Sequence, residues 1–389
     1  MTRVDALVVG AGPAGSALAA GLARAGARVV LAEGARHPRS KACAEYASPR
    51  IVEELARIGL PPAAWCGEAV RLAGMELVAG GKRARIAYAD RGGPRSAWGV
   101  DRRTFDERLA RHAATCGVEL REGTRLVRLA THGGRVTGGV LRAPDGTETR
   151  VEADLVVGAD GVRSTVARQA GVERSVRFPR RLGLVAHYAG IEALTDHGEM
   201  HVGRGYYVGL APTPGGELNV GMALPVGGRA TAAERFEAAI LGLPVVAERL
   251  DGSRRLTPIH GAAPIGHRVT GVAGPGWLLV GDAAGFVDPF TGEGIYRALR
   301  SARAATDAIV AGGDVAGHYR AERRRAFAAK SALTWLVQGF LAVPPLLEHA
   351  VGRLDARPAA ALRLGSALGD CVPATSALSP RALFEVLAP

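Results

Sequence analysis

The most informative part of the sequence is GDAAGFVDPFTGEGI, residues 281–295. It follows a short apolar run, residues 277–280, which is typical of a buried β-strand. A matching arrangement lies near the start of the chain, where GAGPAG at residues 10–15 follows the apolar run at residues 6–9. Alanine-rich sequence then continues to about Arg24 and predicts a helix. Both stretches therefore predict the order strand, glycine turn, helix.

The GAGPAG motif has the GxGxxG spacing of a dinucleotide-binding turn. Gly10 permits the tight turn, Gly12 lets backbone amides approach a pyrophosphate, and Gly15 lets the helix pack closely on the strand. Pro13 and Ala14 begin the predicted helix, whose N-terminus favours an anion. We therefore expect all five residues to hold a dinucleotide.

Two further motifs make the prediction specific. A second strand, residues 28–32, is followed by Glu33, where a carboxylate can accept a hydrogen bond from an adenosine ribose and disfavours a 2'-phosphate. A third strand, residues 154–157, leads into the turn Asp160-Gly161. With Gly281-Asp282 at the end of a fourth strand, the motifs predict a site for flavin adenine dinucleotide (FAD).

In this order the motifs resemble the FAD-dependent class that includes the para-hydroxybenzoate hydroxylase type, known as group A flavin monooxygenases, and the geranylgeranyl reductases. The resemblance implies that Gly281 and Asp282 bind the ribityl chain and that Asp160 braces the FAD site. It also implies a helix N-terminus beside the pyrimidine end of the isoalloxazine ring, formed by Gly292, Gly294 and Ile295.

Other segments match the same class. HPRSKACAEYASP, residues 37–49, resembles the Lys-x-Cys segment of geranylgeranyl reductase relatives, and residues 288–294 resemble their flavin-facing loop. VDRRTFD, residues 100–106, matches the pattern in which an arginine precedes a helix beside the cofactor, which implies this role for Arg102. The Phe-Pro-Lys turn of the geranylgeranyl reductases proper is absent, and residues 205–214 read GYYVGLAPTP instead.

Because the FAD motifs lie far apart, we predict an α/β, Rossmann-like FAD-binding domain that is discontinuous and interrupted by an antiparallel-sheet substrate domain. The inserted sheet is predicted from strands at residues 184–191, 199–210 and 217–224 and from a hairpin within residues 70–89. A helical C-terminal region follows, in which Trp335, Leu336, Phe340 and Leu341 recur at helical spacing. The predicted ranges are 1–75, 100–180 and 257–330 for the FAD-binding domain, 76–99 and 181–256 for the substrate domain, and 331–389 for the C-terminal region.

The composition limits the partners. The formal net charge is +12, but the basic residues are scattered and only Lys41, Lys82 and Lys330 are lysines, so we predict no nucleic-acid binding. No apolar window of about 18 residues or more occurs, and the first strand begins too early for a signal peptide. We therefore expect a cytoplasmic protein without an integral membrane segment. The four cysteines lack metal-type spacing, so we predict no metal site.

The chain contains no second GxGxxG motif with its own strand and ribose acid. A reductant such as NADPH or NADH is therefore expected to dock transiently. The predicted substrate is a small molecule, and the sequence predicts no oligomeric state.

Three residues are candidates for catalysis. Cys43 and Glu45 lie in the loop expected to reach the flavin, where Glu45 can accept a proton from a phenol or supply one to a carbanion. The alternative is that Cys43 is a small buried apolar residue and that Glu45 pairs with an arginine such as Arg39 or Arg50. Pro289 is the third candidate, because it precedes the turn beside the cofactor.

Aromatic side chains supply the candidate substrate pocket, and we expect only two or three of them to touch substrate, because aromatic residues in strands more often fill the core. A histidine base is also open on the predicted strands, although a hydrogen-bonded structural role is favoured for each. The aromatic candidates are Tyr46, Tyr206, Tyr207, Phe286 and Phe290, and the histidines are His187 and His201.

The sequence favours a monooxygenase that hydroxylates or epoxidises a phenolic or polyketide-type small molecule through a flavin C4a-hydroperoxide, because the Phe-Pro-Lys feature is absent. The first alternative is a flavin-dependent reductase of carbon–carbon double bonds, in which Cys43 or Glu45 helps to place a proton. The second is a non-catalytic FAD-binding scaffold. A flavin halogenase is disfavoured, because no Trp-x-Trp-x-Ile-Pro sequence occurs.

Overall fold

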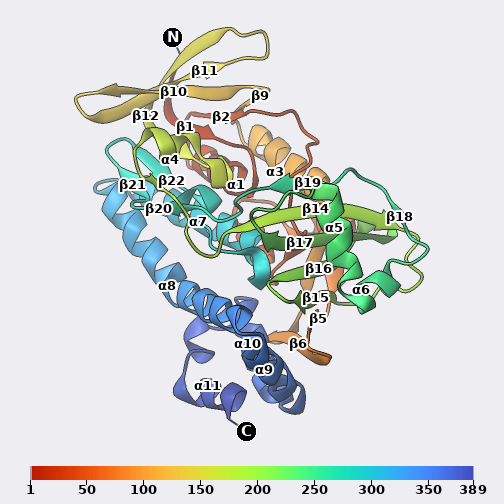
Figure 1. Ribbon diagram of the computed structural model, residues 1–389. Helices are drawn as coiled ribbons and strands as arrows, with labels where there is room; N and C mark the ends of the chain where they lie inside the picture. Colours follow the sequence, from red (N-terminus) through yellow and green to blue (C-terminus); the bar gives the residue numbers. More distant parts are fainter. Residues whose placement is uncertain (1, 389) are drawn as a thin grey trace.

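The computed structural model describes residues 2–388 and is built on two large sheets with helices around them (Figure 1). The first sheet contains the GxGxxG turn and has the order β10-β11-β12-β1-β2-β9, with β22 beside β12 and β21 beside β22. Its strands are β1 (Thr2–Val9), β2 (Val29–Glu33), β9 (Glu119–Glu122), β10 (Arg125–His132), β11 (Arg135–Arg142), β12 (Glu148–Gly158), β21 (Ala273–Gly274) and β22 (Trp277–Leu279).

The centre of this sheet is parallel, as the four predicted FAD strands require. β1 pairs in parallel with β12 and β2, and β22 pairs in parallel with β12. Val8, Leu31 and Val157 are fully buried in neighbouring strands, which explains why these strands are almost continuously apolar in sequence. The carboxyl ends of β1, β12 and β22 consequently bring the three glycine turns to one edge.

Helices cover both faces of the first sheet. On one face α1 packs against α7 and α3, and small residues let the backbones approach closely: a Cβ on Gly21 would lie 3.0 Å from the Thr306 side chain. The short α4 packs on the other face. The helical segments of this half are α1 (Pro13–Arg24), α2 (Ile51–Arg57), η1 (Pro62–Ala64), η2 (Cys66–Glu68), α3 (Arg102–Thr115), η3 (Gly161–Arg163), α4 (Thr165–Gln169), η5 (Gly281–Ala284), η6 (Pro289–Thr291) and α7 (Gly294–Ala311).

The second sheet has the order β18-β14-β17-β16-β15-β5-β6-β7, with β19 beside β14. It is antiparallel except between β5 and β15, which run parallel. The strand predicted over residues 199–210 is two strands, β15 and β16, because the chain turns at Gly205, whose φ is 81°. The strands are β5 (Gly74–Ala79), β6 (Lys82–Asp90), β7 (Gly93–Arg95), β14 (Arg181–Ala189), β15 (Gly198–Gly203), β16 (Tyr206–Thr213), β17 (Glu217–Pro225), β18 (Arg254–Arg255) and β19 (His260–Ala262).

Smaller elements connect the two large sheets and cover the second one. A three-stranded sheet has the order β3-β8-β4, and β13 and β20 form a separate two-stranded ribbon. Helices α5 and α6 cover one face of the second sheet. The bounds are β3 (Tyr46–Ala47), β4 (Ala69–Leu72), β8 (Ala97–Val100), β13 (Glu173–Arg174), β20 (Arg268–Val269), η4 (Pro214–Gly216), α5 (Ala232–Leu241) and α6 (Pro244–Arg249).

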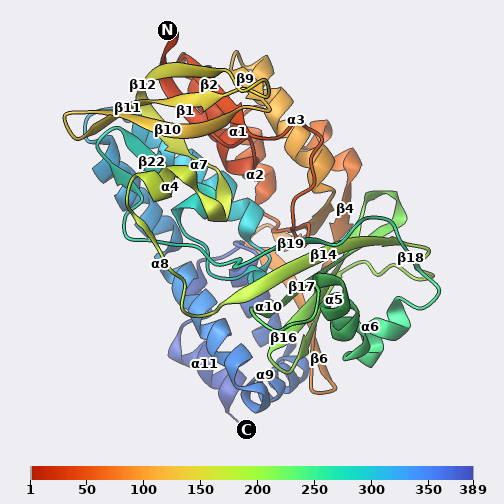
Figure 2. The ribbon, with the colours of Figure 1, turned by 45° about the horizontal axis from the view of Figure 1, so that its top comes forward.

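The C-terminal helices pack on the other face of the second sheet, against β5 and β6 (Figures 1 and 2). Helix α8 runs without interruption through residue 330 and reaches both halves: the Tyr319 hydroxyl donates to the Leu279 carbonyl at 2.6 Å, and Leu341 packs under β5 and β6. The predicted domain boundaries stay a prediction. The helices are α8 (Val315–Ala342), α9 (Pro344–Ala356), α10 (Pro358–Leu368), η7 (Ala374–Ser376) and α11 (Pro380–Leu387).

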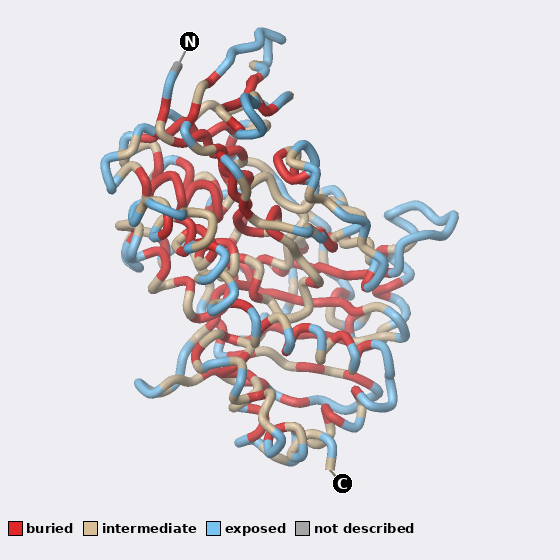
Figure 3. Tube along the Cα trace, turned by 90° about the vertical axis from the view of Figure 1, so that its left-hand side faces the viewer, coloured by how far each residue is buried: buried red, intermediate tan, exposed pale blue. Residues whose placement is uncertain are grey.

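Figure 3 shows buried residues running through the middle of both halves and exposed residues in the outlying loops. Over residues 2–388, no helix taken singly is long and apolar enough to cross a membrane. Helices α8 and α9 satisfy the length and composition criteria only as a pair, with a bend of 114° between them.

Candidate functional site

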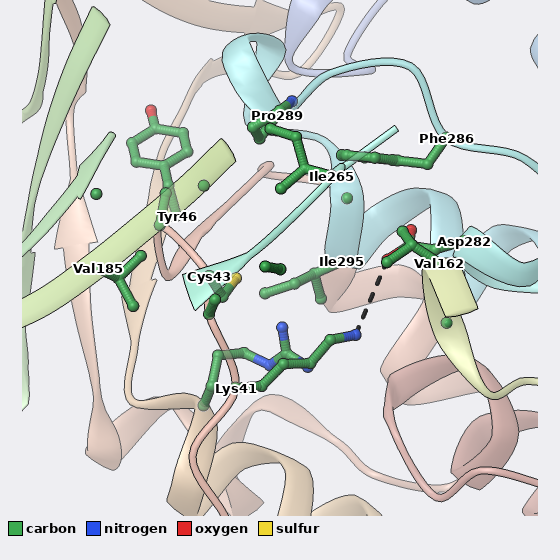
Figure 4. A pocket seen from close by; sticks show the side chains of 18 of the residues that line it. Lys41, Cys43, Tyr46, Val162, Val185, Ile265, Asp282, Phe286, Pro289 and Ile295 are labelled. Carbon is green, nitrogen blue, oxygen red and sulfur yellow. Dashed lines mark ion pairs between the residues drawn. The ribbon is translucent and has the colours of Figure 1, made fainter. Parts of the chain in front are cut away.

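A cavity of about 430 Å³ lies between the two sheets, where the glycine turns of the first meet β14 to β17 and β19 of the second (Figure 4). The tertiary structure brings most of the predicted site residues to its wall. Those that line it are Gly12, Pro13, Ala14, Cys43, Tyr46, Arg102, Tyr207, Gly281, Asp282, Phe286, Pro289, Gly292, Gly294 and Ile295.

An adjoining cavity of about 360 Å³ shares Gly12, Lys41 and Gly161 with the first. Three more predicted residues line it, namely Gly10, Glu33 and Asp160. The two cavities thus form one elongated space from Glu33 at the end of β2 to the start of α7, the shape that an extended dinucleotide requires. We call this space the FAD cavity.

The glycine turn has the geometry that the motif predicts. Gly10 has a φ of 101°, and a Cβ there would lie 2.5 Å from the Ala159 carbonyl oxygen. Gly15 lines neither part of the cavity, because its Cα faces the Gly10 carbonyl oxygen, 1.8 Å from where a Cβ would lie. Gly15 therefore serves helix packing. Glu33 accepts hydrogen bonds from the backbone N–H groups of Ala11 at 2.8 Å and Ala35 at 3.1 Å, so its carboxylate also braces the turn.

Two basic side chains at the FAD cavity were not predicted as site residues. Arg39 lies 3.5 Å from Glu33 and 3.4 Å from Asp106, yet its buried Nε has no partner among the described residues. Lys41 Nζ lies 3.9 Å from the Asp282 carboxylate (Figure 4). Arg39 Nη2 lies 3.6 Å from where a Cβ on Gly12 would lie, and a cationic guanidinium beside the glycine turn fits an anionic pyrophosphate. The basic run at residues 37–41, directly after β2, was the signal for both.

Arg102 is buried at the start of α3 and forms a bidentate pair with Asp106, at 2.7 and 2.8 Å. Burial opposes the charge of Arg102, but the Asp106 carboxylate and the Cys43 side chain hold its pKa well above its usual range. The charge is therefore permanent. Asp101 begins the helix by accepting a hydrogen bond from the Arg103 N–H at 2.9 Å.

Glu45 lies behind the cavity wall, only 2% exposed, with a φ of 57°. Its carboxylate accepts the Arg102 N–H at 3.0 Å and the Asn219 side-chain amide at 3.0 Å. Asn219 also donates to the Cys43 carbonyl at 3.1 Å. Glu45 lines neither part of the FAD cavity, so the structure supports a positioning role, and direct catalysis by Glu45 stays a prediction.

The alternative that pairs Glu45 with an arginine side chain such as Arg39 or Arg50 is wrong. The ionisable partner of Glu45 is His187, whose Nε2 lies 2.6 Å from the carboxylate. Burial lowers the pKa of His187, but the hydrogen bond and charge of Glu45 outweigh it and leave the pKa above its usual value. His201 instead lies 2.9 Å from Glu199 on β15, in agreement with the favoured structural role.

Pro289 lines the FAD cavity in a loop fixed by the buried Asp288. The Asp288 carboxylate accepts hydrogen bonds from Arg181 at 2.6 Å, the Tyr207 hydroxyl at 2.8 Å and the Phe290 N–H at 3.0 Å. The loop is consequently tied to β14 and β16 of the second sheet.

The predicted aromatic residues separate into three groups. Tyr46, Tyr207 and Phe286 line the FAD cavity, whereas Phe290 lines a different cavity described below. Tyr206 lines none of these cavities, because successive residues of a strand face opposite sides of the sheet. Its hydroxyl donates to the Ala239 carbonyl of α5 at 3.3 Å. The structure therefore corrects the assignment of Tyr206 to the substrate site.

A third cavity, of about 100 Å³, lies between the second sheet and helices α8 to α11, and we call it the apolar cavity. Tyr46 and Met200 line both it and the FAD cavity, so the two spaces adjoin. The Tyr46 hydroxyl is fixed 2.6 Å from that of Tyr88. The other side chains on this wall include Leu77, Ile86, Phe290, Leu333, Leu336, Val337, Phe340, Leu347, Ala350, Val351, Leu354, Leu364, Leu368, Leu383 and Val386.

A buried charge cluster joins the start of α7 to the C-terminal helices. Lys330 Nζ lies 3.2 Å from Glu293 and 2.9 Å from Asp370, and it donates to the carbonyls of Ala367 and Leu368. Burial lowers the pKa of Lys330, but the two carboxylates outweigh it and hold the pKa above its usual value. Burial raises the pKa of Asp370 to about 6, against the opposing effect of Lys330.

Comparison with known proteins identifies the cofactor family. The family model described as "FAD binding domain" matches residues 3–203. A menaquinone reductase from Mycolicibacterium smegmatis is 37% identical over 334 residues, covering 80% of this chain and 78% of the relative. A digeranylgeranylglycerophospholipid reductase from Methanosarcina mazei is 31% identical over 331 residues, covering 80% and 77%.

Solved structures share the whole fold. The flavin-dependent brominase Bmp2 superposes with a TM-score of 0.83 at 22% identity, covering 99% of each chain. A geranylgeranyl bacteriochlorophyll reductase-like protein from Thermoplasma acidophilum superposes with a TM-score of 0.80 at 21% identity, covering 100% of this chain and 96% of the other. At these identities the likeness shows the fold alone.

Proposed function

Because the chain belongs to the FAD-binding-domain family and is an FAD-dependent oxidoreductase, we propose that it reduces carbon–carbon double bonds in a long, polyisoprenoid-type substrate. Its curated relatives are named as reductases of menaquinone and of a digeranylgeranyl lipid. They favour the reductase alternative over the monooxygenase that the sequence favoured.

The apolar cavity is the observation that carries the proposal. It adjoins the FAD cavity through Tyr46 and Met200, and its wall is almost wholly aliphatic or aromatic. A phenolic molecule held beside the flavin needs no such extension, whereas a long hydrocarbon chain gains about 0.8 kcal/mol for each CH₂ that it buries. The substrate is therefore expected to place one double bond in the FAD cavity and its tail between α8 to α11 and the second sheet.

Double-bond reduction also needs a hydride and a proton at the FAD cavity. Bound reduced FAD supplies the hydride, and the second hydrogen arrives as a proton. Cys43 lines the cavity in a loop that Asn219 and Glu45 hold in place, so its thiol is our candidate proton donor. Asp288 ties the loop at Pro289 to the second sheet, and the buried Tyr46 and Tyr207 line the adjoining wall. NADPH or NADH as the reductant stays a prediction.

The test is reduction of a polyprenyl lipid by dithionite-reduced enzyme under strict anaerobiosis. We expect a product heavier by two hydrogens for each double bond reduced, measured by mass spectrometry. Incorporation of labelled oxygen in an aerobic reaction with NADPH, together with no anaerobic product, would establish the monooxygenase alternative instead.

The apolar cavity is tested by Ala350→Phe, which places a ring in that cavity. We expect the rate with a long prenyl chain to fall at least about tenfold, equivalent to about 1.4 kcal/mol, while a short prenyl substrate and FAD binding are unaffected. Ala356→Phe is the matched control, because Ala356 lies on the same helix but is exposed. Equal losses for long and short substrates would contradict tail binding at this site.

A further inference from the structure

The segment from η3 to the start of β14 carries arginines without acidic partners. In residues 2–388, no carboxylate forms an ion pair with Arg163, Arg174, Arg177 or Arg180, and all four are exposed. Glu173 is the sole acidic residue between positions 161 and 181. The next arginine, Arg181, is different, because it is paired with Asp288. Positive charge therefore accumulates along this segment.

The ribbon of β13 and β20 adds another arginine to this positive surface. Arg174 and Arg268 are direct cross-strand partners, and both are exposed. Like charges in this position destabilise a β-ribbon. A second like-charge pair, Arg125 opposite Arg142 in β10 and β11, is relieved because Arg142 also pairs with Glu148 of β12 at 2.8 Å. Among the described residues no carboxylate relieves Arg174 and Arg268 in this way. An unfavourable pair on an exposed ribbon indicates a surface that an anionic partner neutralises.

This surface lies directly behind the wall of the FAD cavity. Next to Arg268, His267 pairs with Phe286 through two backbone hydrogen bonds of 2.8 Å, and Phe286 lines the cavity. Arg163 donates to the Ala263 carbonyl at 3.0 Å, between the cavity-lining residues Ala262 and Ile265. Arg163 and Arg268 are therefore separated from the FAD cavity by a single layer of residues.

We propose that these arginines dock a small acidic electron-carrier protein that delivers electrons to the bound FAD. The arginine surface is defined as Arg163, Arg174, Arg177, Arg180 and Arg268 with the exposed Phe178. The proposal rests on the reductase function proposed above. Reduction of one double bond consumes two electrons and two protons, so two one-electron carriers are each oxidised once, and solvent supplies the protons.

The composition and shape of the surface favour a protein over a dinucleotide. None of the three cavities described above is lined by these arginines, whereas a small ligand binds in a concave site. Phe178 is 57% exposed in the same segment, and an aromatic residue among arginines is typical of protein interfaces. The net charge of +12 adds long-range attraction toward an acidic partner.

The experiment uses the FAD-loaded protein and a small acidic iron–sulfur carrier of the ferredoxin type. We expect the triple variant Arg174→Glu, Arg177→Glu, Arg180→Glu to bind the carrier at least about tenfold more weakly and to lose most of the salt dependence of binding. Carrier-driven loss of oxidised-flavin absorbance should slow in parallel. FAD content and dithionite-driven turnover should remain unchanged.

The matched control is Arg91→Glu, Arg204→Glu, Arg229→Glu, which reverses three exposed arginines outside this surface. Equal weakening by both triple variants would show that only net charge matters and would overturn the docking site. Loss of NADPH-driven reduction or of duplex DNA binding, with carrier binding intact, would assign the surface to those partners instead. Carrier-driven flavin reduction without a reduced lipid would leave the docking site standing and refute the reductase function.

Discussion

Glu45 and Glu293 are both buried carboxylates beside the FAD cavity, but the protein satisfies them in different ways. Glu45 is 2% exposed and contacts a backbone amide, a side-chain amide and the titratable His187. Glu293 is 4% exposed and is held by the Lys330 ammonium and by the hydroxyls of Thr291 and Thr334. One wall of the cavity therefore responds to pH through an imidazole, whereas the other depends on a permanent cation.

The difference follows from what each carboxylate holds in place. Glu45 orders a short loop next to it in sequence through two amides and through His187, which carries a charge only when it is protonated. Glu293 joins the start of α7 to helices that follow it in the chain, and its contacts include Lys330 and Thr334 of α8. Removal of the Lys330 cation should therefore lower the free energy of unfolding more than neutralisation of Glu45 does.

The largest effect is expected for Lys330→Met, which leaves Glu293 and Asp370 buried without their cation. Breaking a buried pair from one side costs about 3–5 kcal/mol of unfolding free energy. Urea denaturation followed by circular dichroism measures this loss, and flavin fluorescence shows whether FAD is released at the same time. Lys82→Met is the control, because Lys82 is exposed on β6 and should change stability by less than about 0.5 kcal/mol. Similar losses in both variants would refute the stabilising role of the cluster.

Glu45→Gln should have an intermediate effect that depends on pH. His187 has a raised pKa in the folded protein, so its contribution to stability is complete below the ordinary value of 6.5 and is lost as pH rises through the folded pKa. Loss of the charged acceptor should cost about 1–3 kcal/mol where His187 is protonated, and less where it is neutral. Denaturation on both sides of the His187 pKa measures the difference. A loss of stability that is the same at both pH values would mean that Glu45 does not stabilise protonated His187.

Asp370→Asn should have the smallest effect at neutral pH, within about 1 kcal/mol, because Glu293 still pairs with Lys330. Asn also tolerates the positive φ of 62° at this position. The folded pKa of Asp370 is raised from 3.8 to about 6, so the folded protein binds an extra proton in this interval and loses stability as pH rises across it.

The asparagine variant should lack that loss, so its stability relative to the unmodified protein should increase with pH over the same interval. Parallel denaturation series across the interval provide the measurement. Identical pH profiles for the two proteins would show that Asp370 does not titrate there.

Much of the candidate FAD site could be predicted from local sequence patterns. The turn at Gly10, the acid at Glu33 and the carboxylate of Asp282 were all predicted, because a glycine turn between an apolar strand and a helix restricts the backbone to few conformations. These local patterns require no knowledge of distant segments. Arg39 and Lys41 were visible as a basic run, although their place beside the glycine turn was not.

The surroundings of that site depend on contacts between segments that lie far apart in the sequence. Glu45 meets His187 across 142 positions, and Lys330 brings together Glu293 and Asp370. The apolar cavity is assembled from the second sheet and four helices, none of which shows a pocket in its own pattern. An apolar residue in a sequence indicates burial but does not name its neighbours. Partners across long chain separations are set by packing, and packing fixed both the charge pairs and the space for a substrate tail.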